Sequence, residues 1–194
     1  MIELDPKSTA LVLIDLQNGI LGQSLGPSSG GEVLDVGKVL AGRFRAVRAP
    51  VVLVNVGWST DYADALHQPV DRPVQRPEGG FPPAWSALAE GLAQPGDLFL
   101  TKHHWGAFHG TDLDIILRSH GIRTVVLTGV STHVCVETAA REAFVRDYYT
   151  VVVGDGSAAY SQQEHETALK LVDRFFGEVV SMDDIRPLWP LRNL

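Results

Sequence analysis

The sequence is poor in cysteine, in basic charge and in long apolar runs, and each shortage excludes a class of protein. Cys135 is the only cysteine among 194 residues, which rules out an internal disulfide framework and a four-cysteine zinc site. No apolar run approaches the ~20 residues that a membrane-spanning helix needs. Because 16 basic residues face 23 acidic ones, giving a net charge of −7, we expect no nucleic-acid or membrane partner.

The first residues and the overall composition indicate an ordinary globular chain. Residues 1–7 lack the basic start and the apolar segment of a signal peptide, so a cytoplasmic setting is the simplest interpretation. Hydrophobic residues make up 45% of the chain and charged residues 20%, as in typical globular proteins. The length predicts a single domain over residues 1–194.

Short apolar, β-branched runs alternate with segments of helical periodicity. The predicted strands are Thr9–Leu16, Val51–Val56, Leu98–Lys102, Thr124–Gly129, Tyr149–Val153 and Glu178–Ser181. The predicted helices are Val33–Ala49, Trp85–Gly91, Asp112–His120, Val134–Arg146 and Ser161–Phe176. Most of these strands are apolar on both faces, which is typical of buried parallel strands. The alternation predicts an α/β fold of three layers, with a doubly wound parallel sheet between helices.

Two irregular stretches interrupt this alternation. Leu21–Gly31 has the composition of a flexible loop, and Gly57–Pro83 is long, polar and rich in proline. A loop as long as the second one is uncommon inside a compact domain and tends to have a function.

Three chemically active side chains follow predicted strands. Asp15 and Lys102 close the first and third strands, and Cys135 follows the fourth where a helix should begin. Ligands of open α/β sheets bind beyond the carboxyl ends of the strands, so these side chains should converge. A helix N-terminus and a neighbouring cation both lower a thiol pKa, so we expect a reactive thiolate with Asp15 as its base. The amides of Ser131 and Cys135 are placed to receive an oxyanion.

Each of these residues also has an ordinary interpretation. Taken alone, Asp15 fits a helix cap or a structural ion pair, Lys102 a solvated lysine, and Cys135 a small buried hydrophobe. Only their convergence on one edge of the sheet favours catalysis.

Histidines offer two further possibilities that we reject. His133 lies two residues from Cys135, and helical residues at that spacing do not face each other, so we expect it to support the site indirectly. His103, His104 and His109 lack a carboxylate that would complete a ligand set, so no metal is expected. Asp61, Asp64 and His67 fit a solvated face. The first strand is not followed by a glycine-rich dinucleotide or phosphate loop, so we expect no cofactor.

A substrate pocket should form from polar side chains near the strand ends and from loop aromatics. Its candidate residues are Gln17, Asn55, Trp58, Phe81, Trp105 and Phe108.

Three segments together resemble the isochorismatase-like cysteine hydrolases, which include nicotinamidases and N-carbamoylsarcosine amidohydrolases. They are Ala10–Asn18 (ALVLIDLQN), Thr101–Phe108 (TKHHWGAF) and Leu127–Val136 (LTGVSTHVCV). The likeness spans roughly residues 8–182. It implies a six-stranded parallel sheet of order 3-2-1-4-5-6 and a catalytic triad of Asp15, Lys102 and Cys135. It also implies a cis peptide between Val130 and Ser131 that shapes the oxyanion hole.

Two departures from the family bear on the substrate. Metal-dependent nicotinamidases carry an Asp-x-His element after the second strand, where this chain reads Asn55–Thr60 (NVGWST). True isochorismatases lack the cysteine that stands here as Cys135. Both differences favour a metal-independent hydrolase that cleaves a C–N bond of a small amide or carbamoyl compound. The alternatives are an isochorismatase-type vinyl-ether hydrolase, with Arg72 and Arg76 as candidate carboxylate ligands, and a non-enzymatic module with a redox-sensing Cys135.

The family is often oligomeric, and two apolar segments suit a subunit contact. Residues 186–194 (RPLWPLRNL) are unusually apolar for a chain terminus, and Trp105–Phe108 has the same character. We therefore expect a homodimer or a larger homo-oligomer.

Overall fold

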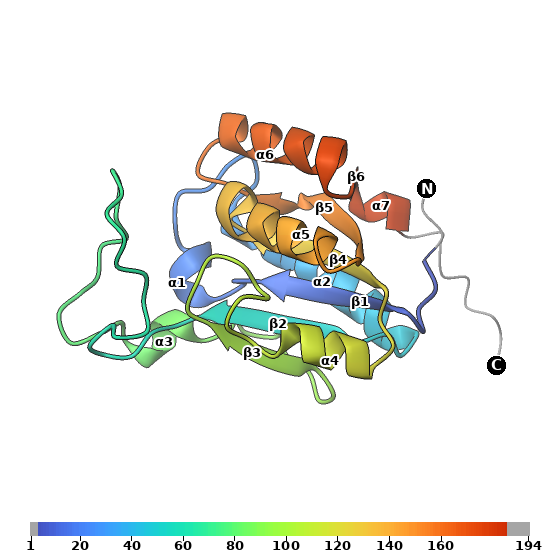
Figure 1. Ribbon diagram of the computed structural model, residues 1–194, viewed down its shortest axis with the longest axis horizontal. Coiled ribbons are helices and arrows are strands. Elements are labelled where there is room, and N and C mark those ends of the chain that lie inside the picture. Colours follow the sequence, from blue (N-terminus) through green and yellow to red (C-terminus); the bar gives the residue numbers. More distant parts are fainter. Residues whose placement is uncertain (1–3, 186–194) are drawn as a thin grey trace.

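A computed structural model describes residues 4–185 and contains one six-stranded parallel sheet (Figure 1). Its strands are β1 (Thr9–Ile14), β2 (Val51–Val56), β3 (Leu98–Lys102), β4 (Thr124–Val130), β5 (Tyr149–Ala158) and β6 (Glu178–Val180). They lie in the order β3-β2-β1-β4-β5-β6, and every pair is parallel. The predicted doubly wound fold and its strand order are confirmed.

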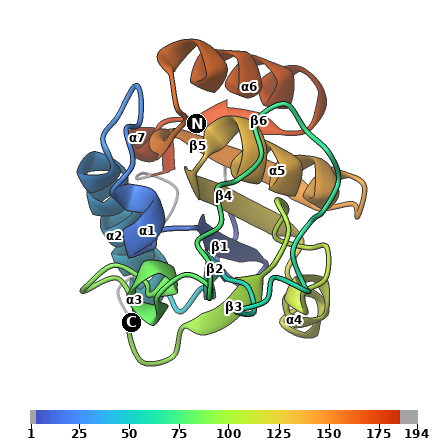
Figure 2. The ribbon, with the colours of Figure 1, turned by 90° about the vertical axis from the view of Figure 1, so that its left-hand side faces the viewer.

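Helices cover both faces of the sheet, as the end-on view shows (Figure 2). The helices are α1 (Asn18–Leu21), α2 (Gly30–Ala46), α3 (Pro83–Ser86), α4 (Leu113–Ser119), α5 (Glu137–Phe144), α6 (Gln162–Phe175) and α7 (Met182–Ile185). A π-helical turn, η1 (Thr132–Val136), precedes α5 directly. Residues of α4, α5 and α6 pack in one core cluster, and those of α2 and α7 pack in another.

Strand β1 lies at the centre and contributes to both cores. All six of its residues are buried. Val12 and Ile14 face the α4–α6 side, whereas Leu11 and Leu13 face α2. Alternate side chains of a strand point to opposite faces, so an apolar run without polar breaks is what a strand covered on both faces requires. The carboxyl end of β1 is thereby held rigidly in the middle of the molecule.

Several element boundaries differ from the prediction, for local reasons. The predicted helix at Trp85–Gly91 is the short helix α3, which ends because Ala87 turns extended and Leu88 bridges to Gln17. The predicted loop at Leu21–Gly31 gives way to α2 at Gly30, where Ser29 and Glu32 form a capping box. Strand β5 continues past the predicted end, Val153, to Ala158.

The long polar segment of residues 57–82, here called the strap, extends beyond the carboxyl ends of the strands. It crosses in front of the strand ends in Figure 2. Trp58 Nε1 donates a 2.9 Å hydrogen bond to the His103 carbonyl, and the Tyr62 hydroxyl donates one of 2.9 Å to the Pro77 carbonyl. Asp64 pairs with His103 at 3.3 Å. The strap is therefore tied to the segment after β3 and folded on itself.

Two segments were expected to form a subunit contact, and the structure describes only one of them. Residues 186–194, one proposed subunit contact, lie outside the described residues. In the other segment Phe108 is only 3% exposed and belongs to the core, whereas Trp105 is exposed. Within residues 4–185, every helix is too short or too polar to cross a membrane.

Gly129 is the point where β4 comes closest to β1, and it permits no side chain. Its φ is 134°, and a Cβ there would lie 2.0 Å from the Ile14 carbonyl oxygen. We expect Gly129→Ala to lower the free energy of unfolding by about 3 kcal/mol, because the strand must shift and a left-handed conformation becomes strained. Urea denaturation followed by circular dichroism measures this change.

Gly42 provides the matched control, since it lies within α2 with open space around its Cα. Gly42→Ala should raise stability by about 0.5–1 kcal/mol through helix propensity. Equal effects of the two substitutions would contradict the role given to Gly129.

Candidate active site

The three predicted catalytic side chains meet at the carboxyl ends of the central strands. Asp15 directly follows β1, Lys102 is the last residue of β3, and Cys135 lies in η1 after β4. Lys102 Nζ is 2.8 Å from Asp15 Oδ2 and 3.7 Å from Cys135 Sγ. Lys102 also donates a 3.1 Å hydrogen bond to the His104 carbonyl. The lysine thus has three acceptors within one buried cluster.

All three residues are withdrawn from solvent. Lys102 is 0% exposed, Asp15 1% and Cys135 7%. Asp15 has a φ of 55°, and its amide donates a 2.8 Å hydrogen bond to the Val54 carbonyl. This left-handed turn at the end of a buried strand sends the carboxylate across to Lys102. Asp15 is not a helix cap and Lys102 is not solvated, whereas the buried ion pair expected as the ordinary alternative for Asp15 is present and Cys135 is buried, as its ordinary interpretation holds.

Burial and mutual charge set the protonation of the cluster. Burial raises the pKa of Asp15, although the Lys102 ammonium opposes that rise. Burial alone would lower the pKa of Lys102, but its interactions with Cys135 and Asp15, whose ionised forms are anionic, raise that pKa above its usual range. The ammonium is therefore the charged group that the site retains most firmly.

The pKa of the Cys135 thiol is raised, whereas the sequence predicted that it would be lowered. Burial raises the pKa of Cys135 to about 11; Lys102 opposes this rise and Asp15 adds to it. The expected lowering by a helix start and a cation is outweighed by the loss of hydration. With that pKa the Cys135 thiol keeps its proton at neutral pH.

The turn that carries Cys135 is organised around one carbonyl. The Ser131 carbonyl accepts hydrogen bonds from the amides of Val134, Cys135 and Val136 at 3.4, 2.9 and 3.1 Å. The peptide between Val130 and Ser131 is cis. Because the Cys135 amide already has this partner, it can bind an oxyanion only as a shared donor, an arrangement common at helix ends.

A cavity of about 560 Å³ opens above the cluster. Asp15, Lys102 and Cys135 lie among its lining residues, and the strap contributes Trp58 and Phe81. Trp105 also lines it, as predicted, and so do Ser131 and several side chains of the strap between Arg72 and Gln75. This volume falls in the range of small-molecule sites.

Three predicted pocket residues do not line this cavity. Gln17 is fully buried, and its carboxamide pairs with the backbone of Val56. Asn55 points instead to the Ser86 carbonyl. Phe108 packs in the α4–α6 core. Gln17 follows β1, Asn55 is the last residue but one of β2, and Phe108 lies six residues after β3. Their side chains form hydrogen bonds or pack within the protein and do not face the cavity.

The sequence interpretation missed other lining residues. Trp85 was assigned to a longer helix, whereas Pro82 and Pro83 before it suit the start of a short one. Tyr160 was missed because β5 was ended too early. Its ring contacts His133 edge-on at 5.2 Å, and His133 Nε2 is 3.9 Å from Glu164. His133 itself lines the cavity.

The other histidines and aspartates that the sequence analysis considered contact one another or neighbouring side chains. His104 and His109 meet edge-on with ring centroids 4.7 Å apart. Asp61 and Asp64 accept hydrogen bonds from Ser59. Among residues 4–185, no group of three or more histidine, cysteine, aspartate or glutamate side chains is arranged to hold a metal ion.

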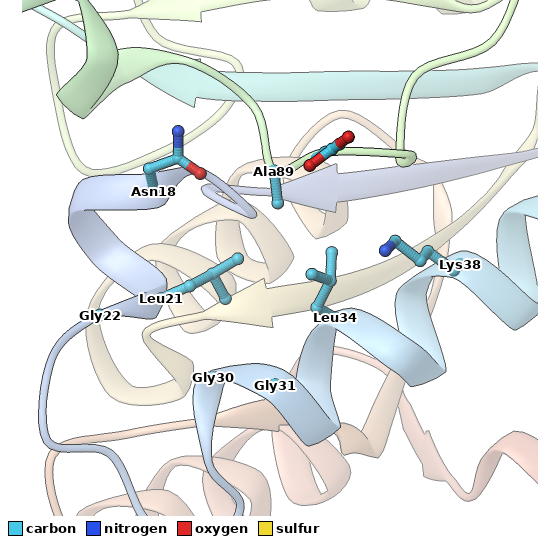
Figure 3. Close-up of a pocket in the computed structure, with 9 residues that line it drawn as sticks. Asn18, Leu21, Gly22, Gly30, Gly31, Leu34, Lys38 and Ala89 are labelled. Atoms are coloured by element: carbon cyan, nitrogen blue, oxygen red, sulfur yellow. The ribbon is translucent and has the colours of Figure 1, made fainter.

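A second hollow, of about 620 Å³, lies between α1 and α2 on the other side of β1 (Figure 3). Leu21 and Leu34 point into it, and Lys38 reaches over one end. Its remaining lining residues are Asn18, Gly22, Gly30, Gly31, Ala89 and Glu90. Cys135 does not line this hollow; it lines the cavity above the Asp15–Lys102 pair.

Comparisons with known proteins show the family to which the chain belongs. The isochorismatase domain model matches residues 9–184, and the chain belongs to the isochorismatase family. It is 43% identical over 186 residues to the isochorismatase family protein YecD of Escherichia coli O157:H7, covering 95% of this chain and 98% of that one.

Other relatives extend the comparison. The ureidoacrylate amidohydrolase RutB of Pseudomonas syringae pv. syringae is 32% identical over 211 residues, covering 94% of this chain and 84% of that protein. The solved structure of an isochorismatase family protein from Burkholderia thailandensis superimposes with a TM-score of 0.89 at 42% identity, covering 95% of this chain and 96% of that one. The family resemblance found in the sequence is confirmed.

The raised pKa of Cys135 has a direct chemical consequence. At pH 7 iodoacetamide should alkylate Cys135 in the native protein more slowly than in the urea-unfolded chain, because only the thiolate reacts. The native rate should keep rising with pH towards about 11. The unfolded chain should level off above about 8.5, the usual pKa of cysteine. Mass spectrometry of the Cys135 peptide gives both rates, and faster native labelling at pH 7 would indicate a stabilised thiolate.

Proposed function

We propose that this protein is a metal-independent cysteine hydrolase that cleaves a C–N bond, in an amide or carbamoyl group, of a small molecule. The observation that carries the proposal is the buried cluster in which Lys102 Nζ lies 2.8 Å from Asp15 and 3.7 Å from the only thiol. A structural cysteine needs neither neighbour. The amidohydrolase activity named for the relative RutB supports the same class of reaction.

In the first half-reaction Asp15 acts as general base. Its carboxylate accepts the Cys135 proton while Sγ forms a bond to the substrate carbonyl carbon. The amides of Ser131 and Cys135 bind the resulting oxyanion, and the Lys102 ammonium balances the charge. The C–N bond then breaks, the nitrogen takes the proton from Asp15, and an amine or ammonia leaves behind a thioester.

The second half-reaction returns the enzyme to its starting state. Asp15, again a carboxylate, accepts a proton from water as the water oxygen bonds to the thioester carbon. The C–S bond breaks, and the thiolate recovers the proton from Asp15. A raised pKa of Asp15 suits this role, because the group must both accept and release a proton.

Substitutions at the cluster test the proposal against a panel of small amides, ureas and carbamoyl compounds, with released ammonia or amine as the measurement. Asp15→Asn should lower kcat by about 10²–10⁴-fold, because the general base is lost. Cys135→Ala should abolish turnover while the circular dichroism spectrum stays native.

The same panel, extended by a vinyl ether, separates the alternatives. Turnover of a vinyl ether by Cys135→Ala would favour isochorismatase-type chemistry. Absence of turnover of every panel compound, together with reversible oxidation of Cys135, would favour a redox-sensing module.

Metal independence is a separate expectation. The cluster supplies a nucleophile, a base and a cation, so no metal is needed to activate water. Turnover should survive exhaustive EDTA treatment within about twofold. Loss of activity that stoichiometric zinc or iron restores would move the protein towards metal-dependent nicotinamidases.

A further inference from the structure

Three aromatic rings form one continuous wall of the active-site cavity. Phe81 and Trp85 stack with ring centroids 4.2 Å apart and an interplanar angle of 25°. Trp58 contacts both of them, with centroids 5.8 Å from each. All three rings line the cavity that contains Cys135. We call this set the aromatic wall, and Trp85 is its member on α3.

Helix α3 is too short to hold Trp85 in place by itself. It has four residues, so its carbonyls have no partners within the helix. Three carboxamide side chains donate to three consecutive carbonyls instead. Asn18 Nδ2 donates to Ala84 at 3.2 Å, Gln17 Nε2 to Trp85 at 3.3 Å and Asn55 Nδ2 to Ser86 at 2.8 Å. We call these three residues the amide clasp.

The clasp is itself anchored to the central strands. Gln17 Oε1 accepts the Val56 amide at 2.7 Å, and Gln17 Nε2 donates to the Val56 carbonyl at 3.0 Å. The Thr101 hydroxyl donates to Asn55 Oδ1 at 2.8 Å, which leaves the Asn55 amino group to face Ser86. The clasp therefore ties α3 to the ends of β1 and β2, the strands next to the catalytic cluster.

Trp85 also packs against Gly19. A Cβ at Gly19 would lie 2.1 Å from Trp85 Cδ1 and Nε1, so the indole packs directly on the backbone of α1. The indole thus packs on Gly19 and stacks on Phe81, and the clasp holds the backbone of Trp85.

We propose that Gln17, Asn18 and Asn55 are positioning residues that fix Trp85, and that Trp85 selects substrates whose non-reacting part is flat and apolar. This proposal deepens the hydrolase function and rests on it. None of the three carboxamides reaches the catalytic cavity. They act on the substrate only through the indole, so their loss should change recognition and leave the chemistry at Cys135 intact.

The experiment measures alkylation of Cys135 in the full chain by two reagents with the same reactive group. Iodoacetamide is small, whereas N-phenyliodoacetamide carries a flat apolar ring. In both, Sγ bonds to the methylene carbon, iodide leaves and the thiol proton is lost to a base. The ratio of the two second-order rate constants, normalised to a free thiol, reports the preference for the ring.

Asn55→Asp and Asn18→Asp keep the size of the side chain but replace the donor with a carboxylate that repels the carbonyl. Each should lower the ratio by about threefold to tenfold, the value of one aromatic contact. The iodoacetamide rate alone should stay within about twofold. Gln17 is avoided because its substitution would also break the contact with Val56.

Gly19→Ala displaces Trp85 without touching the clasp and should lower the ratio to a similar extent. Gln162→Glu, an equivalent substitution on the exposed start of α6, should leave the ratio unchanged. An unchanged ratio in Asn55→Asp, Asn18→Asp and Gly19→Ala would overturn the proposal, as would equal losses for both reagents, which would indicate general damage to the site.

This measurement stays informative if the hydrolase proposal fails. Alkylation needs the Cys135 thiol and the cavity but no turnover, so a protein that hydrolyses no amide still yields the ratio. Where turnover is found, the same variants should raise KM for a flat aromatic amide and leave kcat for a small aliphatic amide unchanged.

Discussion

A lysine ammonium buried without solvent contact is the constraint on which the rest of the site depends. Lys102 is 0% exposed, and a charge in that position must be compensated at short range. Asp15, the His104 carbonyl and the Cys135 sulfur provide this compensation. Removing one partner from a buried pair commonly costs about 3–5 kcal/mol. The three strand ends are thus locked together by electrostatics as well as by the sheet.

The same constraint explains why the thiol is neutral at rest. Lys102 favours an anion nearby, but Asp15 already supplies that charge, and a second anion in a dry site is costly. Burial therefore dominates and raises the pKa of Cys135 to about 11. Under the proposed mechanism, the attack by Sγ and the transfer of its proton to Asp15 therefore occur together.

The sequence predicted the strands, which depend on apolar runs, and the residues that lie at the strand ends. Apolar runs gave the six strands, and their carboxyl ends led to Asp15, Lys102 and Cys135. The direction of the Cys135 pKa was missed, because burial at the base of a cavity follows from tertiary packing. Gln17 and Asn55 were placed near the site, but periodicity cannot tell whether a carboxamide faces a cavity or a carbonyl. Trp85 was missed for a related reason, since a four-residue helix has no period.

Two parts of the cavity wall are held in place by different kinds of interaction. The catalytic cluster is fixed by charge, whereas the aromatic wall is fixed by neutral hydrogen bonds from the adjacent residues Gln17 and Asn18 and from Asn55. Because Asp15 stands two residues before Gln17, the end of β1 positions both the Asp15 carboxylate beside Lys102 and the Gln17 carboxamide that donates to the Trp85 carbonyl. The strap adds Trp58 and Phe81, and it is tied to the segment after β3 through Trp58 and Asp64. Under the proposed function, substitutions in the strap and in α3 would therefore change the substrate while the geometry of Asp15, Lys102 and Cys135 is preserved.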